Sequence, residues 1–489
     1  MTTRAIVVML IAAGLVWIGA PCVGSAQTGA PRRLRESGGL PPAPSTGSAA
    51  QAGGNPFLGG VPTGTAMPGV LPLSLSDALA HGLTHNLGAL LSEQGTRATY
   101  GAKLGALSAL LPTFAGGLTQ ARERINLEAY GFPVPPGTSP IIGPFNVFDA
   151  RVSLSQTVFD YSAIERLRAT SASESASEYA YQDARDVVVQ VCSGLYLQAV
   201  TGAARVEAAR AQLRTADALY KRAVSLKAAG VVAGIEVLRA QVELQSQQQR
   251  VIVLENDLAK EKLALGRAIG LPSGQRFEVT DRVAYAALEG VTLEDSLQRA
   301  YEARSDLKAA GAAVQAAESA RRAAQGEAFP SLHVDAAYGD IGNTAGSAKM
   351  TYSVAATLSV PIFQGGRVRG RVFQADAALQ QQKAQLEDLR SRIDYEVRAA
   401  FLDLKAAEEF VAVAKSTTDL ANEQLTQAQD RFTAGVASNL EVVQAQDAVA
   451  AATENYLSSL YAHNLAKVSL ARALGIAEQS IGQFLGGVK

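Results

Sequence analysis

The sequence predicts a mainly α-helical protein with a small amount of membrane β-structure, built by internal duplication. Three observations predict this fold class. A unit of about 200 residues occurs twice, each copy contains a proline-free helical stretch of about 66 residues, and each copy carries two short segments in which apolar and polar residues alternate. After the first 26 residues the chain contains no run of roughly 20 consecutive apolar residues, so any membrane crossing must be made by strands.

Composition excludes several classes of function. The 489 residues include 44 Lys and Arg against 45 Asp and Glu, a net charge of −1 that does not favour binding to nucleic acid. Charged residues make up 18% and hydrophobic residues 48%, but aromatic residues only 6%, which suits closely packed helices. With four His and two Cys, and with no third ligand beside the His81/His85 pair, we expect no enzyme, no metal site and no cofactor.

The N-terminal residues are typical of an export signal. In residues 1–26, Arg4 is followed by an apolar stretch and by the small residues Gly24-Ser25-Ala26, where cleavage is expected. Cys22 leaves a lipoprotein signal open as an alternative, although Pro21 stands where a small residue is expected. Residues 27–72, rich in Pro, Gly, Ala, Ser and Thr, are predicted to be a flexible linker.

The duplication is visible in short motifs. Leu75-Ser76-Asp77-Ala78-Leu79 recurs as Leu293-Glu294-Asp295-Ser296-Leu297, and Ala229-Gly230-Val231 recurs as Ala434-Gly435-Val436. We therefore predict a first repeat at 73–271, a linker at 272–290, a second repeat at 291–475 and a tail at 476–489. The first copy has extra residues between Pro112 and Leu154, predicted to form a loop.

Each repeat is predicted to run helix, two strands, very long helix, helix. The helices are expected at 76–110, 164–229 and 235–270, and again at 294–328, 368–434 and 440–475. A long helix of about 66 residues would measure roughly 100 Å. The two shorter helices of a repeat, stacked end to end, have about the same combined length, so they would lie along the long one.

The strand segments each have one apolar and one polar face. Alternation is nearly perfect at 351–360, clear at 332–338 and 148–155, and weakest at 113–120. This pattern is typical of an outer-membrane strand, but also of any sheet with one buried face. Two facts favour the membrane: the strand pairs are isolated between helices, and four strands cannot close a barrel that needs about eight. Other copies of the chain must complete it, giving eight strands from two copies or twelve from three.

The chain resembles the TolC-like outer membrane efflux protein family over residues 73–476. The resemblance lies in Leu358-Ser359-Val360-Pro361-Ile362-Phe363-Gln364-Gly365-Gly366 at a strand-to-helix junction, in the two Ala-Gly-Val turns with Ala240-Gln241 and Ala445-Gln446 after them, and in the duplication. It implies a homotrimer whose 12-stranded barrel, with four strands per chain, sits in outer-membrane lipid and continues into a long α-helical periplasmic barrel. It also implies passive conduction in tripartite efflux or type I secretion, with an inner-membrane transporter and a periplasmic adaptor as partners.

The resemblance also suggests where the functional residues lie. The barrel lumen is expected to be lined by His333, Asp335, Ser353, Thr357, Asp149 and Arg151, and Pro361, Gly365 and Gly366 mark the strand-helix junction. Turns at Gly230, Gly234, Gly435 and Asn439 are expected at hairpin tips where the adaptor docks.

The gate is expected at these tips, where Glu441 would form a ring of three carboxylates with Glu236 nearby. Glu236 and Arg239 also fit an ordinary solvated helix pair. Gln444 stands where relatives carry a second acidic residue. Phe432 and Ala437 stand where relatives carry a latching tyrosine and arginine, so this particular latch is not expected here.

Two further hypotheses concern other parts of the chain. Arg367, Arg369 and Arg371 follow Gly365-Gly366 without the Lys-Ser/Thr ending of a phosphate-binding loop, so a tight strand-to-helix turn is favoured, with the arginines near lipid headgroups as a hypothesis. Cys192 is expected to pack as a small hydrophobic side chain. The rival function for the whole chain is a soluble periplasmic coiled-coil adaptor or scaffold.

Overall fold

The computed structural model describes residues 54–135, 137–282, 285–288, 290–434 and 436–485. The predicted signal at 1–26, the possible lipidation of Cys22 and the first half of the predicted linker lie outside these residues.

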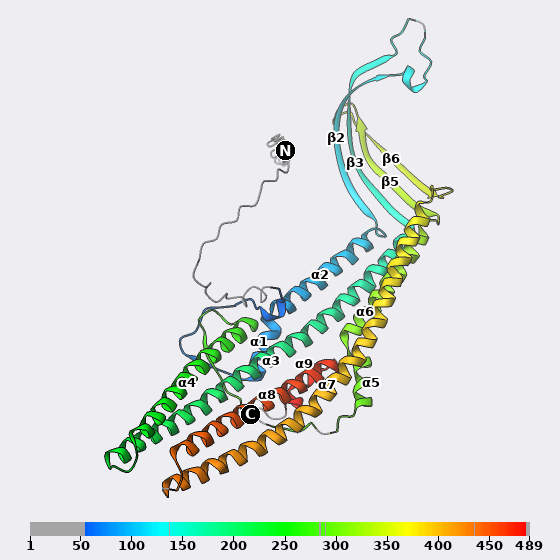
Figure 1. Ribbon diagram of the computed structural model, residues 1–489. Helices are drawn as coiled ribbons and strands as arrows, with labels where there is room; N and C mark the ends of the chain where they lie inside the picture. Colours follow the sequence, from blue (N-terminus) through cyan, green and yellow to red (C-terminus); the bar gives the residue numbers. More distant parts are fainter. Residues whose placement is uncertain (1–53, 136, 283–284, 289, 435, 486–489) are drawn as a thin grey trace, which may run out of the picture. The chain divides into compact units, whose positions relative to one another are not determined.

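The order of elements follows the predicted duplication (Figure 1). The first repeat contains α1 (Leu75–His85), α2 (Leu87–Ser108), β2 (Thr113–Asn126), β3 (Ile141–Phe159), α3 (Tyr161–Ala228) and α4 (Gly234–Ala268), with the short 3-10 turn η2 (Glu128–Tyr130). The second contains α5 (Leu293–Ala303), α6 (Ser305–Gly326), β5 (Ser331–Gly342), β6 (Lys349–Ser359), α7 (Arg367–Thr433) and α8 (Asn439–Ala473). The segments predicted as linkers and tail carry short elements of their own: η1 (Pro56–Leu58) and β1 (Val70–Leu73) before the first repeat, β4 (Arg276–Val279) between the repeats and α9 (Ala477–Phe484) after the second.

The two predicted strand pairs join into one antiparallel sheet in the order β2-β3-β5-β6. The register keeps the two predicted faces continuous across all four strands. One row contains Phe114, Leu154, Ala336 and Val354, and the next contains Thr113, Ser155, Asp335 and Ala355. The alternation therefore makes one apolar and one polar face for the whole sheet.

The apolar face of the sheet is uncovered. Phe114, Leu118, Tyr352 and Val354 each expose about 70% or more of their surface. Among the described residues, neither edge strand, β2 or β6, has a second strand partner. In the first copy, β2 and β3 are longer than β5 and β6, so the extra residues there extend the strands as well as forming the predicted loop.

The long helices α3 and α7 have 68 and 67 residues, as predicted. The shorter helices contact them as expected: α2 and α4 lie against α3, and α6 and α8 lie against α7. Buried small residues recur every seventh position: Gly202, Ala209, Ala216 and Ala223 on α3, and Ala400, Ala407, Ala421 and Ala428 at multiples of seven on α7. A seven-residue period gives a left-handed supercoil, and small side chains let the helices approach closely.

The prediction of unbroken helices at 76–110 and 294–328 was wrong. Each is split at one residue, Asn86 in the first repeat and Arg304 in the second. Asn86 is fully buried, and its Nδ2 donates to the carbonyls of Phe57 (2.7 Å) and Ala268 (3.0 Å). Arg304 is 3% exposed and pairs with Asp306 and Glu396. Tertiary bonds to distant residues therefore hold the breaks, and no Pro at either break marks them in the sequence.

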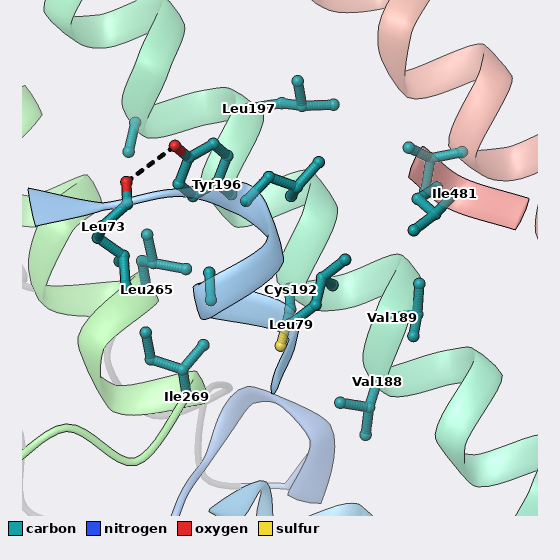
Figure 2. Close-up of a cluster of buried hydrophobic side chains, with 14 of the residues drawn as sticks. Leu73, Leu79, Val188, Val189, Cys192, Tyr196, Leu197, Leu265, Ile269 and Ile481 are labelled. Atoms are coloured by element: carbon teal, nitrogen blue, oxygen red, sulfur yellow. Dashed lines mark hydrogen bonds between the residues drawn. The ribbon is translucent and has the colours of Figure 1, made fainter. Parts of the chain in front are cut away.

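The largest buried cluster packs α1, α3, α4 and α9 around Tyr196 (Figure 2). The Tyr196 hydroxyl donates to the Leu73 carbonyl (3.0 Å) and to Asp281 Oδ2 (2.6 Å), which ties α3 to β1 and to the chain that follows β4. Cys192 is buried in this cluster, and burial raises the pKa of its thiol to about 12. A Cβ on Gly82 would come within 2.6 Å of the Cys192 Sγ, so only glycine lets α1 approach here. This confirms Cys192 as a packing residue.

Within the described residues, α3 is the one helix whose length and composition would suit a membrane crossing. More than half of its apolar window is buried against protein. A core helix passes the same test, so we assign this window to the core described above.

We predict that Asn86→Ala destabilises the fold by about 2–4 kcal/mol. The change removes both side-chain donors and leaves the Phe57 and Ala268 carbonyls without these partners. The measurement is chemical unfolding followed by circular dichroism. Asn422→Ala is the matched control, since the Asn422 side chain is exposed and bonds only to Thr418 of its own helix. Equal effects in the two variants would contradict the role of Asn86.

A second prediction concerns acid stability. His463 is fully buried on α8, with Lys467 one turn away, Glu408 3.9 Å from its Nε2 and the Tyr285 ring centroid at 5.0 Å. Burial, and then the Lys467 charge, lower the pKa of His463 to about 4. The unfolded chain, with a histidine pKa near 6.5, binds the extra proton, so stability falls as pH drops from about 6.5 to 4, by at most about 1.4 kcal/mol per pH unit.

His463→Leu should flatten this part of the stability profile, measured as the free energy of unfolding against pH. The matched control is His81→Leu, which removes a half-buried histidine of α1. A slope that persists in His463→Leu would show that other groups cause the acid sensitivity.

Candidate functional site

The polar face of the sheet collects all six predicted lumen residues. His333 pairs in register with Thr357, and the Thr157 Oγ1 lies 3.3 Å from His333 Nδ1. Three rows further along this face, Arg151 donates from Nε to Asp149 Oδ1 at 2.7 Å. Asp335 and Ser353 belong to the same face by the alternation of β5 and β6. The face is hydrophilic with mixed charge, as a water-lined surface requires.

Lys349 also belongs to this face and was missed by the sequence analysis. It pairs with Ile341, which in turn pairs with Asp149. The predicted strand began at residue 351, whereas β6 begins at Lys349, so this lysine was taken as lying beyond the strand. Lys349 and Met350 continue the same alternation of polar and apolar residues, so the signal for these two additional strand residues is present in the sequence.

The apolar face has the dimensions of a membrane band. On β6 and just after it, exposed apolar residues run from Met350 to Val360. This span is about 34 Å along a strand, or about 26 Å along the membrane normal at the usual tilt near 40°. It matches the apolar band about 25 Å tall that outer-membrane barrels show.

The two helical hairpins end in the predicted turns. Gly230 follows α3 with φ +75°, and the Gly230 and Val231 N–H groups donate to the Lys227 and Leu226 carbonyls, which closes the helix end. Gly234 is the first residue of α4 and Asn439 the first of α8. Gly435 lies outside the described residues. Gly230 and Gly234 therefore lie in the turn between α3 and α4, and Asn439 lies where α8 begins.

Each predicted gate carboxylate has an arginine of its own hairpin beside it. Arg239 Nη1 lies 2.8 Å from Glu236 Oε1 on α4, and Arg431 Nη2 lies 3.6 Å from Glu441 Oε2 across the α7–α8 turn. The Arg431–Glu441 pair is largely exposed, and such pairs contribute about 0–1 kcal/mol. Arg431 had no sequence signal, because only the hairpin turn brings it back to Glu441.

The remaining predicted tip residues differ in their surroundings. Gln444 is exposed, whereas Phe432 is half-buried and packs against the small cluster of Ala428, Val442 and Ala445 inside its own hairpin. Phe432 thus holds the α7–α8 hairpin together in this structure.

A mostly apolar groove of about 350 Å³ lies between the two hairpins near their ends. Its walls come from the starts of α4 and α8, so no single stretch of sequence indicates it. It is lined by Ile235, Leu238, Arg239, Val242, Glu243, Leu440 and Val443.

The strand-helix junction after β6 is a sharp turn. Gly365 and Gly366 have φ +58° and +85°, and Gly366 is the N-cap of α7. Backbone in this region favours glycine. Pro361 lies between the end of β6 and this turn. The two positive φ angles make glycine a conformational requirement of this turn.

Among the described residues, no group of three or more His, Cys, Asp or Glu side chains is arranged to hold a metal ion.

Comparisons with known proteins agree with this geometry. The family described as outer membrane efflux protein matches residues 88–271 and 296–476, one match for each repeat. The pyoverdine export outer membrane protein OpmQ of Pseudomonas aeruginosa is 27% identical over 390 residues, which cover 77% of this chain and 79% of that protein. The alkaline protease secretion protein AprF of the same species is 22% identical, covering 69% and 71%.

Solved structures share the fold. The Campylobacter jejuni CmeC outer membrane channel superposes with a TM-score of 0.70 at 17% identity, covering 84% of this chain and 89% of that one. A membrane protein from Pseudomonas aeruginosa gives 0.71 at 18% identity, covering 86% and 97%. Family members form trimers and work with inner-membrane transporter complexes.

The predicted family, the four-stranded contribution per chain and the duplicated helical architecture are thereby confirmed, and the soluble adaptor alternative is not supported. The chain belongs to the outer membrane efflux protein family, and it is a non-enzymatic outer-membrane channel of the tripartite efflux or type I secretion type that extends into the periplasm.

Proposed function

We propose that three copies of this chain form one continuous duct that conducts its cargo passively and opens at the hairpin tips. The observation that carries the proposal is the four-stranded sheet with an exposed apolar face and two unpaired edges. Three copies supply twelve strands, and β6 of each copy pairs with β2 of the next. The energy for transport comes from the partner transporter.

The lumen of this barrel is lined by the polar face of the sheet. A barrel of twelve strands is wide enough to hold water unless loops fill it. His333, Asp335, Ser353 and Thr357, with the Asp149–Arg151 pair, present alternating charge and hydroxyl groups to that water.

The gate is a ring at the hairpin tips. Three copies of Glu441 around the axis attract cations and repel anions at a constriction. Arg431 of the same hairpin lies beside each Glu441 and reduces the charge of the ring. Glu236, beside Arg239, forms a second set of carboxylates close to the groove between the hairpins.

The periplasmic adaptor docks at the same end. The groove between α4 and α8 offers exposed apolar side chains, Leu238 and Val242, next to the charged Arg239 and Glu243. A helical partner segment with apolar residues on one face suits such a groove. The names of two relatives refer to different cargo, pyoverdine for OpmQ and alkaline protease for AprF.

We predict that locking the tips stops transport. Gln444→Cys places an exposed thiol on α8 near the tip, and a short thiol cross-linker would join the copies around the axis. Transport in cells that lack other channels of this type should fall to the background level after cross-linking and recover after a reducible linker is cleaved. Asn455→Cys, exposed about three turns further along α8, is the control. Full transport by a cross-linked Gln444→Cys trimer would refute gating at the tips.

A separate prediction concerns ion selectivity. Glu441→Gln should lower the cation-to-anion permeability ratio of the purified channel, and Arg431→Gln should raise it, each by up to about fivefold, because an exposed pair of this kind involves at most about 1 kcal/mol. The reversal potential across a planar bilayer under a KCl gradient measures the ratio. Glu409→Gln, an exposed position far from the tip on α7, should change it less. Shifts of the same sign in both tip variants would contradict the ring.

A further inference from the structure

Four arginines gather where the sheet meets the helices. Arg166 lies near the start of α3, and Arg367, Arg369 and Arg371 lie in the first turns of α7. The two strands that precede these helices end close to the arginines in sequence, β3 at Phe159 and β6 at Ser359. We call these four residues the arginine belt.

A single carboxylate faces most of the belt. Glu327, directly after α6, has a side chain that is 9% exposed, and it is contacted by Arg166 (Nη2 to Oε1, 3.1 Å), by Arg367 (Nη1 to Oε2, 3.3 Å) and by Arg371. Arg369 has no ion pair among the described residues, and its guanidinium stands 5.4 Å from the Phe373 ring centroid. The belt therefore has more positive charge than Glu327 neutralises.

The arginines do not stabilise the helix in which they lie. The first turn of α7 contains no acidic residue, and its N-cap, Gly366, provides no side-chain hydrogen bond. The N-terminal end of a helix has a partial positive charge, so cations there are unfavourable by a few tenths of a kcal/mol or more each. The α7 arginines oppose this helix end and need another explanation.

Exposed apolar side chains lie directly beside the belt. Ile362 and Phe363, in the turn between β6 and α7, are 96% and 88% exposed, and Phe373 on α7 is also exposed. They continue the uncovered apolar face of the sheet past the end of β6. The protein surface thus passes from apolar to strongly basic within a few residues, which is the order in which a membrane passes from acyl chains to phosphates.

We propose that the arginine belt binds the headgroups of anionic phospholipids in the periplasmic leaflet of the outer membrane. The inference deepens the proposed function and relies on its placement of the sheet in the membrane. A guanidinium group donates two parallel hydrogen bonds to the oxygens of one phosphate group, and Phe363 and Ile362 contact the adjoining acyl chains. The excess positive charge and the continuity with the apolar sheet face identify a lipid as the occupant.

The test uses the full-length trimer purified in a neutral detergent and measures its binding of phosphatidylglycerol by native mass spectrometry. The variant Arg367→Gln/Arg369→Gln/Arg371→Gln is expected to bind this lipid about tenfold to a hundredfold more weakly, since each arginine near a charged membrane surface contributes about a factor of five. The control Arg390→Gln/Arg392→Gln/Arg398→Gln removes the same charge from exposed positions further along α7 and should stay within about twofold of the wild type.

Equal lipid binding by the triple variant and the control overturns the proposal. Competition by millimolar inorganic phosphate as strong as that by the lipid also overturns it, because the site would then bind free anions rather than headgroups. If the triple variant does not assemble, the single variant Arg369→Gln provides the test, because it leaves the Glu327 ion pairs intact. It should weaken phosphatidylglycerol binding about threefold to fivefold. Unchanged binding would overturn the proposal.

Failure of the proposed function is a different result. It would appear as a wild-type protein that forms no trimer in the outer-membrane fraction. Failure of the arginine belt would appear as assembled trimers whose phosphatidylglycerol binding does not depend on these arginines.

Discussion

The structure depends on one constraint, that backbone N–H and C=O groups at a sheet edge must be paired wherever lipid replaces water. An unpaired group in hydrocarbon costs several kcal/mol, and the outer edges of β2 and β6 together carry many of them. One chain cannot satisfy them, since its own sheet ends at these two strands. Assembly with sister chains is therefore part of folding for this protein. Closing the barrel also positions the helices that are connected to the four strands.

The parts of the fold with a short repeat in the sequence could be predicted. Successive side chains of a strand point to opposite faces of the sheet. The sequence alone therefore assigns Val354 and Ser353 to opposite faces, without knowledge of the register. The long helices were visible because about 66 residues pass without proline, and the duplication because its motifs recur in order. Each of these signals is contained in a short stretch of sequence and can be recognised without knowing the tertiary contacts.

The parts made by residues far apart in sequence could not be predicted. The breaks at Asn86 and Arg304 depend on partners such as Ala268 and Ala473, which the fold brings near. Arg431 reaches Glu441 only because of the hairpin turn, and Glu327 of the second repeat contacts Arg166 of the first only where the two repeats pack together. The sequence names candidate residues, but it does not indicate the charges that lie beside them, such as Arg431 beside Glu441.

The small residues spaced at multiples of seven on α3 and α7 also determine the diameter of the helical tube. Helices in contact through alanine or glycine stand near the lower limit of the usual 8–10 Å between axes. In a ring of twelve helices, a change of 1 Å in this spacing alters the circumference by about 12 Å and the diameter by about 4 Å. The inner diameter of the periplasmic tube is thus determined by small buried side chains that do not contact the cargo. Substitutions that enlarge these side chains would widen the tube.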